Sequence, residues 1–511
     1  MKVGSKTYIG EKVQDGFYDS ISHLKFRDQA ALNSSTTFKN FSADFTNILE
    51  ICKHGSPIPP ISEMDCFKLM QRMKPTVNDV NGITINHYIH AGPAGIKHFH
   101  LLLSCLLNDV NNTDIEEINT VYACILFKGH NKDKTSDRSY RAISSCPVIA
   151  KALDLYIRDL HIESWNLDQA ETQFQGEGSS HELAAVLLTE ATQISLHTSK
   201  EPVYVLYLDA KSAFDVVLQE LLVRNLFNCN TSGHSLLYIN NRLGNRKTFI
   251  DWGDNLLGPV HDEQGLEQGG VNSSDFYKIF GKEQLTTAQD SQLGVKLGSL
   301  TVSGIGQADD TALLSNCLFK LFCLLQLTIA FCKRYQVTLC HEKTKLQVFS
   351  TSKMKTLVDY AVQTNPIHLN GKKINFSDSA EHVGMLRSSS GNLPTILARF
   401  IAHNNALGGV LHTGIARGHR GNPAASIHVD RVYGVPVLLS GLAPLVLSEP
   451  EQSLINQHHK DKMSNFQRLL PCTPRAVIYF LGGSLPGVAL SPPPTTIYLW
   501  YDHQTSRKHP K

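Results

Sequence analysis

The stretch "SGIGQADDTALLS" (303–315) carries two adjacent aspartates, Asp309 and Asp310, between short runs that are typical of strands. Two neighbouring carboxylates repel each other, so they need either hydration or a cation. Such a pair is either an ordinary solvated turn, where aspartate is common, or part of a metal site. The segment 295–316 predicts two strands of a hairpin with the aspartate pair near its turn. The choice between the two interpretations depends on what the rest of the chain brings to this turn.

A third aspartate, Asp209, lies 100 residues before Asp309, at the end of "VYVLYLDA" (203–210). This nearly continuous apolar run is typical of a strand that is buried on both faces. If the two strands are neighbours in one sheet, three carboxylates meet at one edge. Carboxylate oxygens are ligands that Mg²⁺ prefers, and two such ions can activate a hydroxyl and stabilise a leaving oxygen in phosphoryl transfer.

The pattern of helices and strands around these aspartates predicts an α+β fold, a small sheet with helices packed on one face. An apolar stripe of period 3.6 predicts a helix over 318–332. Ser62 is the expected N-cap of a helix over 62–73, and Ser179 or Ser180 that of a helix over 179–200. Other helices are expected at 97–110, 144–164 and 272–285, further strands at 246–253 and 344–350, and mainly helices from about 385 onward.

Composition narrows the class of protein only broadly. The chain has 511 residues, 18% of them charged, and a formal net charge of +2, so its overall charge does not indicate a nucleic-acid binder. Basic residues are concentrated at 128–141 and 241–247. The 11 scattered cysteines include no CxxC pair, which favours free thiols in a reducing compartment. The most apolar stretches, 317–332 and 435–447, fall short of the roughly 20 residues of a membrane span. We therefore expect an intracellular protein without a membrane segment.

Several motifs together resemble the reverse transcriptases of LINE-type, non-LTR retrotransposons. "LYLDAKSAFDVV" (206–217) resembles their first palm motif, in its LD-x-x-x-AFD form. "GLEQGGVNSS" (265–274) is similar to their G-x-P-Q-G-S motif. "GQADDTALLS" (306–315) resembles their Y/F-A-D-D motif, and "HEKTKLQVF" (341–349) the lysine-bearing motif that follows.

Further elements appear in the family's order, from about residue 60 to 490. They are "LFKGHNKDKTSDRSYRAISS" (126–145), "ETQFQGEGSSHELA" (171–184) and "AEHVGMLRSS" (380–389). The resemblance implies a right-hand polymerase with an antiparallel palm sheet backed by helices. The expected parts are an N-terminal extension (1–60), fingers (61–200), a palm (201–360, with a fingers insertion at about 225–265), a palm–thumb junction (361–390), and a mainly helical thumb and C-terminal region (391–511).

The resemblance also implies the metal ligands. Asp209 and Asp309 match the main ligands of two Mg²⁺ ions, for which Mn²⁺ is an alternative, and Asp310 matches the supporting carboxylate. The backbone carbonyl of Ala210 is a further expected ligand. Phe214 matches the aromatic residue that excludes the ribose 2′-hydroxyl, and it favours DNA synthesis over the related RNA-dependent RNA polymerases. The alternative role of Phe214 is core packing.

The remaining expected roles concern the nucleotide. Gln268 and Gly269 match the motif that holds the template base and the incoming nucleotide, and glycine permits close backbone approach. Lys128 and Arg141 match basic fingers positions that grip the triphosphate. A solvated basic loop is the alternative for Lys128.

One more basic residue is expected near the departing pyrophosphate, as a proton donor. Lys343 and Lys345 both fit this position, and the sequence does not choose between them.

The chain departs from the family pattern at four positions. Gln307 replaces the aromatic residue that supports the primer terminus. Glu267 replaces the proline before Gln-Gly, and we expect its negative charge to disfavour bound polyphosphate. Gly270 replaces a serine, and Ala142 replaces a proline in the fingers. None of these changes removes an expected metal ligand.

Two hypotheses follow from these motifs. In the first, the chain is an RNA-directed DNA polymerase that binds an RNA template, a DNA primer and dNTPs, in a cytoplasmic ribonucleoprotein and in the nucleus. In the second, it is a weak or inactive retrotransposon relic that keeps the fold and binds RNA. We recognise no apurinic-type endonuclease, zinc knuckle or RNase H, and therefore expect a polymerase section only.

Overall fold

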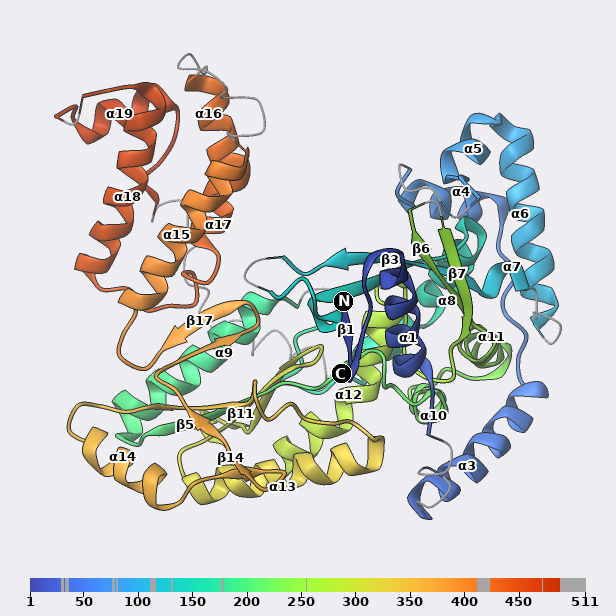
Figure 1. Ribbon diagram of the computed structural model, residues 1–511, viewed down its shortest axis with the longest axis horizontal. Helices are drawn as coiled ribbons and strands as arrows, with labels where there is room; N and C mark the ends of the chain where they lie inside the picture. The colour runs from blue at the N-terminus through green and yellow to red at the C-terminus, as the bar shows by residue number, and fades with distance from the viewer. Residues whose placement is uncertain are drawn as a thin grey trace, which may run out of the picture. The chain divides into compact units, whose positions relative to one another are not determined.

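The computed structural model in Figure 1 mixes helices with several small sheets, which confirms the predicted α+β class. It describes residues 1–28, 32, 36–75, 79, 81–110, 116–129, 132–175, 179–253, 255–410, 423–470 and 472–487. Parts of the predicted basic loop (130–131) and of the segment 171–184 (176–178) lie outside these described residues. Within the described ranges, no helix is both long and apolar enough to cross a membrane.

The chain forms two compact units. The first unit comprises Met1–Glu171, Ala210–Thr286 and Leu327–Leu339, and the second comprises Thr172–Asp209, Thr287–Gln326 and Cys340–Lys511. Each unit is assembled from segments far apart in the sequence, so each is described by itself. The predicted fingers, palm and thumb boundaries remain predictions.

The second unit is built on a five-stranded sheet in the order β10-β11-β5-β12-β15. The first four strands run antiparallel to their neighbours, as predicted for a palm sheet, whereas β15 joins β12 in parallel. The strands are β5 (Val203–Leu208), β10 (Gly304–Gln307), β11 (Asp310–Ser315), β12 (Lys345–Phe349) and β15 (Asn375–Phe376).

The central strand β5 is buried along its whole length. Helix α9 (His181–Ile194) packs on one face of the sheet, where its Ala184 and Leu188 join Val205 and Ile305 in the core (Figure 1). A continuous apolar run suits this position because neither face of the strand meets water.

The segment 295–316 forms two successive hairpins, so the prediction of a single hairpin is wrong. The first hairpin pairs β8 (Val295–Leu297) with β9 (Leu300–Val302), and the second pairs β10 with β11. Gly298 has a φ of 62° and turns the first hairpin where an extended strand was expected. The aspartate pair lies at the turn of the second hairpin.

Two further hairpins and two helices complete this part of the second unit. They are β13 (His368–Leu369) with β14 (Lys372–Lys373), β16 (Ser379–His382) with β17 (Met385–Ser388), α13 (Leu318–Tyr335), which continues into the first unit, and α14 (Lys355–Thr364).

The first unit contains a second sheet, in the order β4-β3-β6-β7. Its strands are β3 (Thr120–Phe127), β4 (Tyr140–Ser145), β6 (Lys247–Trp252) and β7 (Asn255–His261). Its helices are α1 (Val13–Lys25), α3 (Thr36–Lys53), α4 (Glu63–Arg72), α5 (Ile85–His90), α6 (Gly92–Asn108), α7 (Glu116–Asn119), α8 (Val148–Leu167), α10 (Gln219–Asn228), α11 (Gly233–Gly244) and most of α12 (Ser273–Asp290). The short pair β1 (Lys2–Val3) and β2 (Lys6–Thr7) precedes α1.

Local signals located most helix starts correctly. Ser62 caps α4 by accepting a hydrogen bond from the Asp65 N–H, and Ser180, not Ser179, caps α9. The helix predicted over 144–164 begins only at Val148, because residues 144 and 145 belong to β4 and pair with β3. Strand pairing here overrides the helical period of the sequence.

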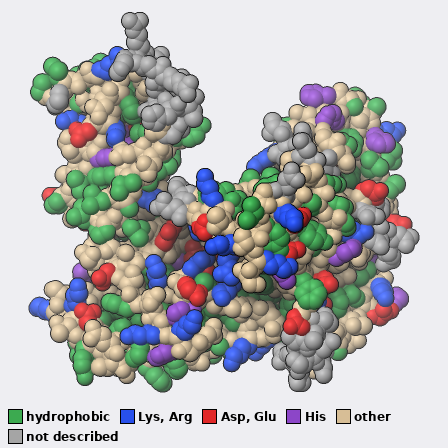
Figure 2. Space-filling model, in the orientation of Figure 1, with side chains coloured by type: hydrophobic (Ala, Val, Ile, Leu, Met, Phe, Trp, Pro, Cys, Tyr) green, Lys and Arg blue, Asp and Glu red, His purple; other side chains and the backbone are tan. Residues whose placement is uncertain are grey.

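The described residues from Leu393 onward are mainly helical, as predicted, whereas 385–388 form β17 and residues 411–422 and 488–511 lie outside the described residues. This helical part consists of α15 (Leu393–Val410), α16 (Pro423–Val429), the π-helix η6 (Asp430–Gly434), α17 (Val435–Leu439), α18 (Glu449–Gln467) and α19 (Arg475–Gly482). A buried contact of 2.7 Å between His403 Nε2 and Asp430 Oδ1 joins α15 to η6. Hydrophobic side chains also gather on the surface over α15 and α18 (Figure 2), and Leu393, Leu397 and Ile401 of α15 are 50%, 47% and 62% exposed.

Candidate active site

Three carboxylates of the second unit gather at one end of its sheet. Asp209 directly follows β5, Asp309 lies in the turn between β10 and β11, and Asp310 is the first residue of β11. Strands β5 and β11 pair with Leu208 opposite Thr311, so Asp209 and Asp310 are the next residues at the same end. The expectation that the two strands are neighbours is therefore confirmed.

The surroundings of the Asp310 carboxyl raise its pKa. Burial, together with the nearby charges of Asp309 and Asp209, raises its pKa to about 6. A hydrogen bond of 2.9 Å from the Val383 N–H to Asp310 Oδ2 opposes the shift, because it stabilises the ionised form. Asp309, in contrast, is exposed.

A lysine side chain contacts the first carboxylate of the group. The Nζ atom of Lys343 lies 3.0 Å from both carboxylate oxygens of Asp209. Lys345, the other candidate, lies in β12 opposite Tyr207. The structure thus brings Lys343, which the sequence could not separate from Lys345, to the acidic group.

The acidic group fits a cation. Its carboxylate oxygens are hard ligands, its charges raise the pKa of Asp310, and an ammonium group contacts Asp209. In the part of the chain that the structure describes, no group of three or more His, Cys, Asp or Glu side chains already has the arrangement of a metal centre. Ala210 forms a backbone bridge with Leu339, and its predicted role as a carbonyl ligand remains a prediction.

The turn that carries Asp309 is held from outside the hairpin. Ala308 has a φ of 53°, a conformation that costs a non-glycine residue about 1–2 kcal/mol. Its N–H lies 3.3 Å from Gln175 Oε1, which accepts the hydrogen bond. The Phe174 N–H donates to the Gly306 carbonyl, and Gln307 pairs with Asp310 at the end of the hairpin. Gln307 is thus half-buried and part of the turn that presents the aspartates.

The predicted nucleotide-binding residues Phe214, Gln268 and Gly269 belong to the first unit. The Phe214 ring stacks on Tyr277 with centroids 4.7 Å apart and an angle of 17° between the planes. The Gln268 carbonyl accepts a hydrogen bond of 2.8 Å from the Ser144 N–H. Gly269 has a φ of 107°, and a Cβ there would lie 3.2 Å from the Ser144 carbonyl oxygen. This position therefore favours glycine.

The side chain of Gln268 contacts a residue that the sequence reasoning missed. Its Nε2 atom lies 3.3 Å from Asp215 Oδ2, and burial raises the pKa of the Asp215 carboxyl. Asp215 is the aspartate of the quoted "AFD" in 206–217, which could have marked it as a candidate. The contact joins the two motifs within one unit.

The two predicted basic residues lie on the β3–β4 hairpin, and both are exposed. Arg141 in β4 pairs with Leu126 of β3. Lys128 follows β3, and its Nζ atom donates a hydrogen bond of 2.6 Å to the Arg138 carbonyl. The structure places both in the first unit, whereas the three aspartates and Lys343 belong to the second.

The charge of Glu267 is compensated, contrary to the expectation that it would face bound polyphosphate. Its carboxylate is 9% exposed and forms ion pairs with Arg242 and Arg246. Both arginines come from the basic stretch 241–247, and they are buried rather than solvated. The sequence showed these charges but could not show that they meet.

Comparison with known protein families indicates the class of protein to which part of the chain is similar. Residues 131–374 match the reverse transcriptase (RNA-dependent DNA polymerase) family. The chain therefore contains a reverse transcriptase domain, and the predicted right-hand polymerase fold class is confirmed. No curated protein matches the chain.

Two solved structures to which the chain is similar are telomerases. One is apo telomerase from Candida tropicalis truncated from the C-terminal domain, with 12% identity, a TM-score of 0.36, and coverage of 53% of this chain and 54% of that one. The other is telomerase from Candida albicans in complex with a TWJ fragment of telomeric RNA, with 11% identity, a TM-score of 0.39, and coverage of 73% and 66%. The chain thus spans about half to two thirds of their lengths.

Proposed function

We propose that this protein is an RNA-directed DNA polymerase that adds dNTPs to a primer 3′-hydroxyl on an RNA template. The observation that carries the proposal is the gathering of Asp209, Asp309 and Asp310 at the ends of neighbouring strands. The reverse transcriptase match over residues 131–374 supports the same activity at the level of the family.

The expected roles follow from this arrangement. Asp209 and Asp309 would hold two Mg²⁺ ions, with Asp310 as the supporting carboxylate. When bound, such ions activate the attacking hydroxyl and neutralise the charge of the leaving pyrophosphate. Lys343, already beside Asp209, is the candidate proton donor to that pyrophosphate.

The residues of the first unit would select and orient the nucleotide. Phe214 would exclude the 2′-hydroxyl, because its ring is held by Tyr277 and only half-buried. Gln268 and Gly269 would contact the template base and the incoming nucleotide. Arg141 and Lys128 would bind the triphosphate, since both are exposed cations.

The motif form favours an origin in a non-LTR, LINE-type retrotransposon. Residues 208–215 have the LD-x-x-x-AFD form of these elements. The proposed partners are accordingly an RNA template and a DNA primer, and the proposed compartments are a cytoplasmic ribonucleoprotein and the nucleus.

Primer extension on an RNA template with Mg²⁺ and dNTPs tests the proposal. We expect incorporation by the wild type and none by Asp309→Asn. The matched control is Asp290→Asn, which makes the same change at an exposed aspartate at the end of α12 and should retain incorporation. Incorporation that survives in Asp309→Asn refutes the assigned site. RNA binding without any incorporation by the wild type refutes the polymerase and supports an RNA-binding relic, and such binding should weaken with salt.

A further inference from the structure

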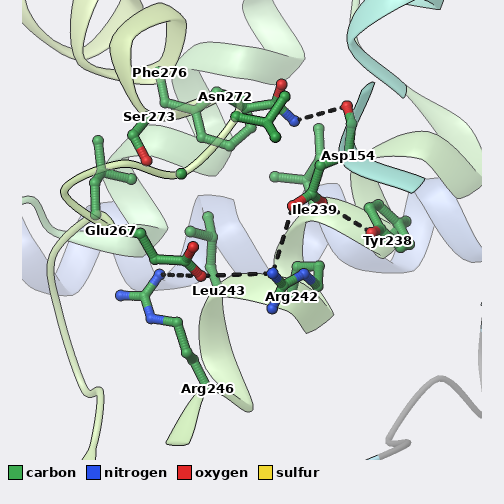
Figure 3. Close-up of a pocket in the computed structure, with 13 residues that line it drawn as sticks. Asp154, Tyr238, Ile239, Arg242, Leu243, Arg246, Glu267, Asn272, Ser273 and Phe276 are labelled. Carbon is green, nitrogen blue, oxygen red and sulfur yellow. Dashed lines mark hydrogen bonds and ion pairs between the residues drawn. The ribbon is translucent and has the colours of Figure 1, made fainter. Parts of the chain in front are cut away.

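The loop 265–270, which carries Gln268 and Gly269, lines a small cavity of about 30 Å³ in the first unit (Figure 3). That volume accommodates roughly two water molecules, so the cavity is too small for a nucleotide. Its walls are charged, however, and come from α8, α11 and the start of α12 as well as from the loop. The residues around the cavity therefore show how the loop is held in place, and they do not indicate a second ligand.

The loop reaches this cavity through Glu267. Figure 3 shows its carboxylate between two guanidinium groups. Glu267 Oε1 lies 3.5 Å from Arg242 Nη2 and 3.7 Å from Arg246 Nη1, and the side chains of the two arginines are 8% and 2% exposed. Ion pairs this deeply buried are screened little by salt.

Each arginine is tied to a different part of the unit. Arg242 Nη2 donates to Asp154 Oδ2 of α8 at 3.4 Å, and Asp154 also accepts a hydrogen bond of 2.9 Å from the Tyr238 hydroxyl. Burial opposes the charged form of Arg242, but the carboxylates of Asp154 and Glu267 outweigh it and hold the Arg242 pKa above its ordinary value. Arg242 thus remains a cation that binds the loop to α8.

Arg246 connects the same carboxylate to Asp262, which directly follows β7, and to the loop backbone. Its Nε atom contacts Asp262 Oδ2 at 2.5 Å, and its Nη2 donates to the Gly265 carbonyl at 2.9 Å. Asp262 Oδ2 also forms an ion pair with Lys25 Nζ of α1, at a distance of 3.1 Å. Buried charges therefore anchor the loop at Gly265 and Glu267, both on the N-terminal side of Gln268.

Gly270 is explained by the same arrangement. A Cβ at position 270 would lie 2.6 Å from Ser273 Oγ and 3.0 Å from Glu267 Cβ. Both distances are below van der Waals contact, so a side chain does not fit there while Glu267 occupies its present place. Two departures from the family pattern, Glu267 and Gly270, thus fit together, because the missing side chain at 270 leaves room for the Glu267 side chain.

We propose that Arg242 and Arg246 are positioning residues, which fix the Gln268–Gly269 turn through the buried Glu267 carboxylate and so set the affinity for the incoming nucleotide. This inference rests on the proposed polymerase function. Arg242 is the better residue to test, because its Nε and Nη1 atoms have no hydrogen-bond partner among the described residues. Its hold on the loop therefore depends on the ion pair with Glu267.

The test compares Arg242→Met with the wild type by amide hydrogen exchange in 265–270 and by the KM for dNTPs. Loss of the cation removes the ion-pair partner of the buried Asp154 carboxylate and leaves Glu267 paired with Arg246 alone. We expect exchange in 265–270 to accelerate, and the dNTP KM to rise, by about tenfold each, with a smaller change in kcat. Arg242→Lys, which keeps the charge, should restore part of both.

A second variant and a control keep the test decisive. Glu267→Gln preserves shape and removes only the charge, so it should reproduce the rise in KM if Arg242→Met fails to fold. Arg158→Met breaks another ion pair of α8, with Asp275 at 2.8 Å, without touching the loop, and should leave KM and the exchange of 265–270 unchanged.

Two results overturn the inference. One is unchanged exchange in 265–270 in the folded Arg242→Met variant, and the other is an equal rise in KM in Arg158→Met. If the wild type does not extend primers, the proposed function fails, but the hydrogen-exchange comparison still decides whether Arg242 holds the loop.

Discussion

Replacing Asp310 by asparagine should stabilise the protein in the absence of divalent cations. Burial and two neighbouring carboxylates raise the Asp310 pKa from its ordinary 3.8 to about 6. A raised carboxyl pKa means that the folded state binds the proton more tightly than the unfolded state. The stability contributed by this group is complete below about pH 4, and it is lost as the pH rises through about 6.

The size of the effect follows from the same two values. At about 1.4 kcal/mol for each pH unit, the difference between 3.8 and about 6 amounts to about 3 kcal/mol above pH 6, as an upper bound. Asparagine has nearly the same shape, and its carbonyl oxygen can still accept the hydrogen bond from Val383. Asp310→Asn should therefore keep the packing and remove the unfavourable charge.

Thermal unfolding in a chelator, at pH 8 and at pH 5, measures this prediction. We expect Asp310→Asn to raise the midpoint at pH 8 by several degrees, since about 1 kcal/mol corresponds to about 2–4 °C in units of 150–250 residues. The gain should be about half as large at pH 5, where the unfolded carboxyl is already ionised but the folded one is still mostly protonated. Asp309→Asn, at an exposed position, is the control with a smaller gain. No gain at pH 8, or an equal gain at both pH values, refutes the reasoning.

Three further substitutions test single contacts. Lys343→Ala should lower the Mg²⁺ concentration for half-saturation by up to about fivefold, because the ammonium group competes with the cation for Asp209. A calorimetric titration that shows no change would contradict this. Phe214→Ala should increase incorporation of rNTPs relative to dNTPs by roughly tenfold or more, and an unchanged ratio in primer extension contradicts the 2′-hydroxyl role. Gly269→Ala should lower the free energy of unfolding by about 1–3 kcal/mol, because a Cβ strains the turn against Ser144. A wild-type thermal midpoint and dNTP KM in that variant would show that the turn tolerates a side chain.

Much of the fold was predictable because the signals are local. The six residues of β5 form a continuous apolar run, and that pattern alone indicates burial on both faces. Ser180 lies immediately before the helical period of α9, where an N-cap is expected. The prediction failed at residues 144 and 145, because the hydrogen bonds to β3 that decide their conformation come from a distant strand.

The candidate site divides in the same way. The sequence identified the three aspartates through their motifs, and strand pairing then placed Asp209 and Asp310 at one end of the sheet. It could not choose between Lys343 and Lys345, because both are lysines of one short segment. Only the folded structure shows that Lys343 contacts Asp209. It also could not foresee the burial of Glu267, since a carboxylate is usually exposed.

The sequence by itself thus determined the α+β class, the identity of the acidic residues and the reverse transcriptase resemblance, because periodicity and motif spacing are carried by neighbouring residues. Tertiary structure alone decided how the charges combine. Arg242 and Arg246 neutralise Glu267, and Lys343 contacts Asp209, across separations that no local pattern encodes. The physical reason is that ion pairing depends on distance and burial in space, and only the folded chain sets these.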